Sequence, residues 1–73
     1  MGTGLRIKHY LETNGISQSH LGRRTGIALA KLNLSLNEKR TLKLDEYKSI
    51  CYALGVSADT FLEPKPPDKF RKS

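Results

Sequence analysis

The chain has 73 residues, with 13 Lys or Arg against seven Asp or Glu and a formal net charge of +6. A chain this short forms one domain with a small core, and its single cysteine, Cys51, excludes a disulfide framework and a thiolate metal cluster. With no apolar run of membrane-spanning length and no signal-peptide core at its start, we expect a soluble cytoplasmic protein.

Hydrophobic periodicity predicts an all-α domain of five helical segments, because no alternating strand pattern is present. The first segment covers about residues 3–14, and Gly15 supplies the left-handed residue that ends it. The second covers about residues 18–25, with Ser17 as its N-cap and a tight turn at Gly26. Local sequence signals therefore predict where the first helix ends and where the second begins and ends.

The third segment, about residues 28–36, carries two stripes of side chains at helical spacing. We expect one stripe to pack inward and the other to face a partner. The inward stripe comprises Leu29, Leu32 and Leu36, and the outward stripe comprises Ala30, Asn33, Leu34 and Asn37.

The fourth segment, about residues 44–54, has the clearest core stripe, and a last short turn from Ser57 is expected to bring Phe61 and Leu62 back onto it. Cys51 lies within this stripe, so we interpret it as a small core residue rather than a redox sensor. The stripe comprises Leu44, Tyr47, Ile50, Cys51 and Leu54.

The composition changes after Leu62. Residues 63–73 contain three prolines and six charged residues, a composition that can neither continue a helix nor bury much surface. We therefore predict one domain at residues 1–62, followed by a basic, Pro-rich, disordered tail at residues 63–73.

Basic residues are concentrated between residues 17 and 43. This segment holds six Lys or Arg against the single acid Glu38, a net charge of +5. Helices with such a charge favour a polyanion as their partner. The six basic residues are Arg23, Arg24, Lys31, Lys39, Arg40 and Lys43.

A series of short motifs follows most of the chain in a fixed order and spacing. It comprises Gly15-Ile16-Ser17-Gln18, Leu21, Thr25-Gly26-Ile27, Leu32, Asn37, Lys39-Arg40, Ala53-Leu54-Gly55-Val56-Ser57 and Phe61-Leu62. In these residues the chain resembles the phage-repressor helix-turn-helix group, the XRE family, which includes Cro and lambda-type repressors. The resemblance implies a compact five-helix, lambda-repressor-like domain whose third helix enters the DNA major groove, with Gln18 touching a phosphate.

The chain departs from the family pattern around its third helix. Glu38 stands where the family often has Gly, and we expect Asn37 to take the left-handed conformation instead. Ala28 replaces a capping Ser, which costs about 1 kcal/mol. The positions that read bases in relatives are mostly apolar here, namely Ala28, Leu29, Ala30, Asn33 and Leu34.

Alignment and helical wheel disagree about the orientation of this helix. Ser35 falls where relatives place an aliphatic core residue, and Leu36 lies one position later. One position is about 100° of rotation, so the helix can be turned relative to its relatives. We follow the wheel and predict that Leu29 belongs to the core.

The predicted DNA contacts follow from these assignments. Asn33 has the donor and acceptor that match adenine, and Leu34 can contact a thymine methyl, although the simplest alternative for both is an ordinary surface residue. The predicted base-reading residues are Ala30, Asn33, Leu34 and Asn37. The predicted phosphate-binding residues are Gln18, Arg23, Lys31, Lys39, Arg40 and Lys43.

No pattern in the sequence indicates catalysis. His9 and His20 have no paired carboxylate or second metal ligand, and no nucleophile, base and orienting group occur together. No Gly-rich phosphate loop follows a strand. We therefore predict no enzyme, no metal site, no cofactor and no small-molecule substrate.

The leading functional prediction is sequence-specific binding of double-stranded DNA by a small transcriptional regulator, on family analogy a repressor. A domain of this size contacts few bases, so two copies are expected on a pseudo-palindrome. One alternative is a protein-binding adaptor of the same fold, an antitoxin or antirepressor, that uses Ala30 and Leu34. A weaker alternative is nonspecific coating of nucleic acid.

Overall fold

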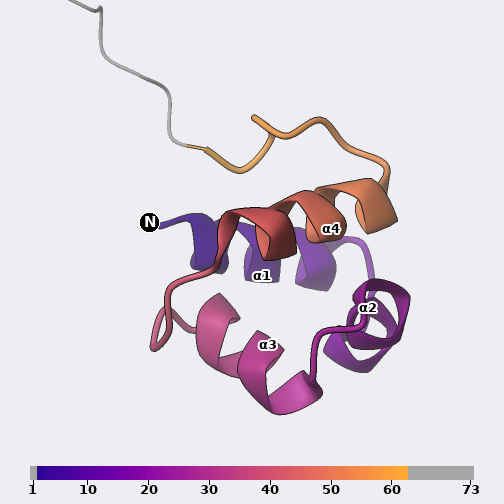
Figure 1. The fold of residues 1–73 in the computed structure, drawn as a ribbon. Coiled ribbons are helices and arrows are strands. Elements are labelled where there is room, and N and C mark those ends of the chain that lie inside the picture. The colour runs from indigo at the N-terminus through magenta and orange to yellow at the C-terminus, as the bar shows by residue number, and fades with distance from the viewer. Residues whose placement is uncertain (1, 63–73) are drawn as a thin grey trace, which may run out of the picture.

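The computed structural model describes residues 2–62, which form four helices without any strand (Figure 1). They are α1 (Thr3–Thr13), α2 (Gln18–Thr25), α3 (Leu29–Leu36) and α4 (Leu44–Leu54). Helix α2 packs against both α3 and α4, and α1 packs against α3. The all-α prediction is confirmed. The predicted tail at residues 63–73 lies outside the described residues.

The prediction of a fifth helix is wrong for the described residues. After α4 the chain makes only isolated turns, in which Thr60 N donates to the Ser57 carbonyl (3.1 Å) and Leu62 N donates to the Asp59 carbonyl (3.3 Å). Such a short segment gains too few hydrogen bonds to offset helix nucleation.

The turns between helices follow the predicted signals. Ser17 Oγ accepts a hydrogen bond from His20 N (3.0 Å) and caps α2. Gly15 and Gly26 end α1 and α2 with φ values of 66° and 78°, which other residues adopt only with strain. These local signals fix the spacing of the first three helices.

A short turn joins α2 to α3. The Thr25 hydroxyl donates to the Leu21 carbonyl (2.9 Å) and accepts from Ile27 N (3.2 Å). Gly22 is buried, and a Cβ at this position would lie 3.1 Å from the Ile27 carbonyl oxygen. The turn therefore lies directly on α2 and sets the angle at which α3 leaves it.

All four helices contribute to one core. An edge-to-face contact between Tyr10 and Phe61, with ring centroids 5.4 Å apart, holds the segment after α4 against α1. The Tyr47 hydroxyl also fastens this segment by donating to the Ala58 carbonyl. The buried apolar residues are Ile7, Leu11, Leu21, Leu32, Leu36, Tyr47, Ile50, Cys51 and Phe61.

Two leucines that we expected in the core are exposed. Leu44 is 72% exposed and Leu62 is 46% exposed. Leu44 is the first residue of α4, and Leu62 lies in the turn segment that follows α4, so both stand at the ends of the elements that cover the core. The burial of Cys51 is confirmed.

In α3, Leu32 and Leu36 are buried as the helical wheel predicted, and Ser35 is buried where the family alignment has a core residue. Leu29 is 48% exposed, whereas Ser35 is only 2% exposed, so the prediction that Leu29 belongs to the core is wrong. A small residue is needed beside Ser35, since a Cβ at Gly4 of α1 would lie 2.2 Å from the Ser35 carbonyl oxygen. The Ser35 hydroxyl also has a hydrogen-bond donor, Arg40, which makes its burial tolerable.

The left-handed residue after α3 is Glu38, with φ 61°, and not Asn37, with φ −96°. Our prediction for Asn37 is therefore wrong. The Glu38 carboxylate accepts a hydrogen bond from Leu5 N (3.3 Å) at the start of α1, whose N-cap Gly2 has no side chain to do so. This contact helps to offset the cost of a left-handed residue other than Gly, about 1 kcal/mol.

Candidate nucleic-acid interface

Helix α3 lies at the edge of the domain opposite α4 and turns one side outward (Figure 1). On this side Leu29 and Leu34 are 48% and 45% exposed. We call the exposed residues of α3 and its N-cap the reading face; they are Ala28, Leu29, Ala30, Lys31, Asn33 and Leu34. Three of the four predicted base-reading residues, Ala30, Asn33 and Leu34, lie on it.

Asn33 and Gln18 are brought together although they are 15 residues apart in the chain. Asn33 Nδ2 donates to Gln18 Oε1 at the start of α2, over 3.3 Å. Asn33 is exposed and Gln18 is half-buried. Within the described residues, the Oδ1 atom of Asn33 accepts no hydrogen bond. The contact orients the Asn33 amide and leaves its acceptor oxygen unused within the described residues.

Asn37, the fourth predicted base-reading residue, uses its side chain inside the domain. Its Oδ1 accepts from Lys8 Nζ (2.7 Å), and its Nδ2 donates to the Asn33 carbonyl (2.9 Å). Asn37 is half-buried by these contacts. Base reading by Asn37 remains an untested prediction, and the contacts favour a role in joining α3 to α1.

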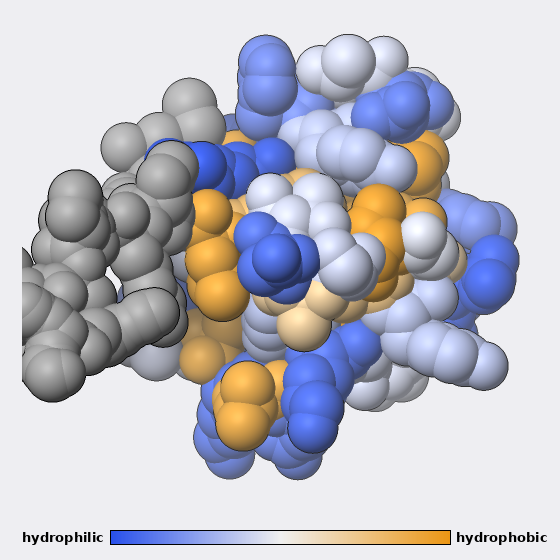
Figure 2. All heavy atoms as spheres, turned by 90° about the horizontal axis from the view of Figure 1, so that it is seen from above, coloured by the Kyte–Doolittle hydropathy of each residue, from blue (hydrophilic) through white to orange (hydrophobic). Residues whose placement is uncertain are grey.

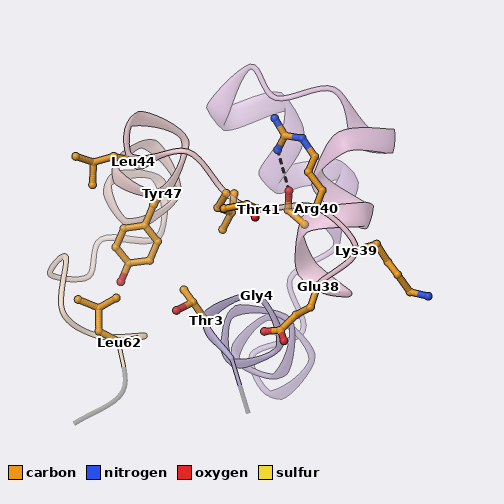
Figure 3. A pocket seen from close by; sticks show the side chains of 11 residues that line it. Thr3, Gly4, Glu38, Lys39, Arg40, Thr41, Leu44, Tyr47 and Leu62 are labelled. Carbon is orange, nitrogen blue, oxygen red and sulfur yellow. Dashed lines mark hydrogen bonds between the residues drawn. The ribbon is translucent and has the colours of Figure 1, made fainter. Parts of the chain in front are cut away.

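Arg40 also has partners within the domain. Its guanidinium donates to both Glu46 carboxylate oxygens (3.0 and 2.9 Å) and to Ser35 Oγ (2.9 Å; Figure 3). The hydrogen bonds that Glu46 accepts from Arg40 and from Lys43 N lower the pKa of Glu46 to about 2. The guanidinium thus connects the end of α3 to the start of α4. Phosphate binding by Arg40 remains untested, but the geometry favours a positioning role.

The remaining basic residues differ from Arg40. Within residues 2–62, the side chains of Arg23, Arg24, Lys31 and Lys39 are exposed and make no hydrogen bond or ion pair. Lys39 N donates to the Leu34 carbonyl (2.8 Å), which places Lys39 directly at the end of α3. Its side chain points away from the neighbouring pocket (Figure 3). Lys43 is exposed at the start of α4.

An open pocket of about 680 Å³ lies beside this end of α3 (Figure 3). Its lining mixes polar and apolar residues from α1, the last turn of α3, the α3–α4 loop, α4 and Leu62, and includes no residue of the reading face. On the face seen in Figure 2, hydrophobic side chains stand in separate groups between hydrophilic ones. Among residues 2–62, no cluster of His, Cys, Asp or Glu has the arrangement of a metal site.

Sequence reasoning missed the contacts that hold α3 in place. Gly4, Ser35 and Glu46 were not singled out for this role, and only the short spacing between Arg40 and Glu46 hints that these two residues pair.

None of the four helices described between residues 2 and 62 has the length and apolarity that a bilayer crossing requires.

The pair α2 and α3, joined by a tight turn and with α3 exposed, defines a helix-turn-helix domain. The family model of the Cro/C1-type HTH DNA-binding domain matches residues 6–67, and the chain belongs to this family. Neither a curated protein nor a solved structure shows a significant match. The predicted family is therefore confirmed, and with it the class of DNA-binding helix-turn-helix regulators.

Proposed function

We propose that this protein is a transcriptional repressor that recognises a specific double-stranded DNA sequence by placing α3 in the major groove. One observation carries the proposal: the reading face is exposed on the helix that follows the turn, where Asn33 is held by Gln18 with its acceptor oxygen free.

Charge supports the same partner. Arg23, Lys31 and Lys39 are exposed and unengaged within the described residues, and they lie on α2, on α3 and directly after α3. Cations around a reading helix bind phosphates on both sides of the groove and fix the register of the helix. Gln18, at the start of α2, adds a neutral donor for a phosphate.

Two copies are expected to bind one operator. A single module of 73 residues buries a small interface and reads few base pairs. Two modules on half-sites about one helical turn apart double the number of bases read. We therefore propose a homodimer on DNA and a pseudo-palindromic operator.

Random-sequence DNA selection tests this function. Specific recognition predicts one enriched motif with two related halves and an affinity that falls with salt, because counterions are released from phosphates. If no motif is enriched and the protein binds all DNA with equal affinity, sequence-specific recognition is overturned and nonspecific coating remains.

A protein-binding adaptor is the second candidate, and the exposure of Leu29 and Leu34 favours it. It predicts that the protein fails to bind any selected DNA and instead forms a stoichiometric complex with a protein. In that complex Leu34→Asp would abolish binding and Asn33→Ala would have no effect. The same pair of variants tested on DNA distinguishes the two functions.

A further inference from the structure

The reading face offers few groups that can hydrogen-bond to a base. Asn33 and Lys31 are its only polar side chains, and Lys31 is a flexible cation of the kind that also binds phosphates. The other four residues are two alanines and two half-exposed leucines. Most of the surface that would meet the bases is therefore apolar.

We propose that α3 recognises its operator mainly through the C5 methyl groups of pyrimidines, with Leu29 and Leu34 as the residues that contact them. This inference rests on the proposed function. In the major groove each base edge presents hydrogen-bonding groups, and the thymine methyl is the apolar group among them. A leucine placed against any other edge would cover polar atoms and leave them without partners.

The positions of the two leucines indicate two separate methyl contacts. Leu29 begins α3, and Leu34 lies five residues later, about 140° around the helix, with Ala30 and Asn33 between them on the reading face. One leucine therefore borders each side of Asn33. The expected half-site is an adenine read by Asn33, with a methylated pyrimidine to either side.

The chemistry extends beyond thymine. A 5-methylcytosine carries its methyl group at the same ring position and presents it in the same groove, and an aliphatic side chain cannot form hydrogen bonds that tell the neighbouring O4 of thymine from the N4 of cytosine. The leucines are therefore expected to accept a methylated cytosine where they accept thymine. Binding would then respond to cytosine methylation at these positions.

Base analogues in the selected operator test this inference. Replacing one contacted thymine by uracil removes a single methyl group and is expected to weaken binding about fourfold, the effect of one lost apolar group. Replacing the T·A pair by 5-methylcytosine·G should restore affinity to within about twofold, whereas unmethylated C·G should not.

Protein variants assign the effect to a residue. Leu34→Ala should bind thymine and uracil operators equally at one position, and Leu29→Ala should do so at the other. Leu44→Ala is the matched control, because Leu44 is an exposed leucine on α4, outside the reading face; it should keep the full response to uracil. Circular dichroism confirms that each variant is folded.

The outcomes separate this inference from the function on which it rests. If no operator is enriched, the proposed function fails. If an operator is enriched but uracil has no effect at any position, methyl recognition is overturned while sequence-specific binding stands. If uracil weakens binding equally in wild type and both leucine variants, the leucines do not read the methyl groups and the assignment is wrong.

Discussion

The reading face and the end of α3 differ in how many of their side chains are hydrogen-bonded within the domain. At the end of α3 a set of contacts, which we call the α3–α4 joint, satisfies almost every polar side chain; it consists of Ser35, Asn37, Glu38, Arg40 and Glu46 with their partners Lys8 and Leu5. On the reading face, apolar side chains stay exposed and the one cation, Lys31, makes no ion pair within the described residues. The hydrogen bonds of the joint thus fix the C-terminal end of α3, and the reading face stays exposed to solvent.

This difference separates stability from recognition along a single helix of eight residues. Substitutions in the joint are expected to change the unfolding free energy or the position of α3. Substitutions on the reading face are expected to change DNA binding while the domain stays folded, because exposed side chains contribute little to stability.

The largest expected effect comes from Gly4→Ala, which acts on the joint. The new Cβ would lie 2.2 Å from the Ser35 carbonyl oxygen, a backbone atom that cannot move without shifting α3. Overpacking of this kind costs about 1–3 kcal/mol of unfolding free energy, in spite of the better helix propensity of Ala. Urea denaturation of the variant and the wild type measures this loss of unfolding free energy.

Gly2→Ala is the matched control for that substitution. The new Cβ would meet the Glu38 carboxylate, the far end of a flexible side chain, and the side chain can turn aside. We expect a much smaller change in the unfolding free energy. Equal losses in the two variants would contradict a specific backbone contact between α1 and α3.

Asn33→Ala acts on the reading face alone. It should lose about 1–3 kcal/mol of binding free energy on the preferred operator, relax the preference at one base pair and leave nonspecific affinity nearly unchanged. Binding titrations on preferred and scrambled DNA measure the specific and the nonspecific affinity.

Asn37→Ala, in the joint, is expected instead to lower the melting temperature, because it removes the contacts to Lys8 and to the Asn33 carbonyl.

Lys39 and Arg40 are neighbours in the chain, but the Lys39 side chain is exposed whereas Arg40 belongs to the joint. Lys39→Ala should weaken binding to all sequences and reduce the slope of log K against log salt by about 1, because one phosphate contact is lost. Arg40→Ala should lower the melting temperature, since Ser35 Oγ loses its donor and Glu46 keeps only the hydrogen bond from Lys43 N, and leave the salt slope unchanged. A flattened slope for Arg40→Ala would show that it also binds a phosphate.

The sequence predicted the parts of this comparison that depend on local signals. The bounds of α1 to α4 were predicted to within one residue. Ser17, Gly15 and Gly26 are local signals for the ends of α1 and α2, and hydrophobic periodicity located α3 and α4. The family alignment pointed to residues of α3 and its N-cap that prove to be exposed, and their contact with bases stays a prediction. Neither required knowledge of how the helices pack.

The rest depends on contacts between distant residues. A helical wheel shows that Leu29 and Leu44 lie on an apolar side but not that each begins its helix beyond the edge of the core. The burial of Ser35 depends on the missing side chain at Gly4, which is 31 residues away, and on a donor from the next loop. The left-handed Glu38 depends on the start of α1.

The smallest expected effect is the pH dependence of the joint. The pKa of Glu46 is lowered from its ordinary value of 4.5 to about 2 in the folded domain, so protons bind the unfolded chain more readily. The stability that the Arg40–Glu46 pair contributes is therefore fully present above about pH 4.5 and is lost as the pH falls through about 2.

We expect Glu46→Gln to have a lower melting temperature than the wild type at neutral pH, and we expect this difference to disappear as the pH falls from about 4.5 to about 2. Melting temperatures of both proteins from pH 6 to pH 2 measure it, with Asp45→Gln, an exposed acid on the same turn of α4, as control. A difference that stays constant down to pH 2 would mean that the ion pair is not its source.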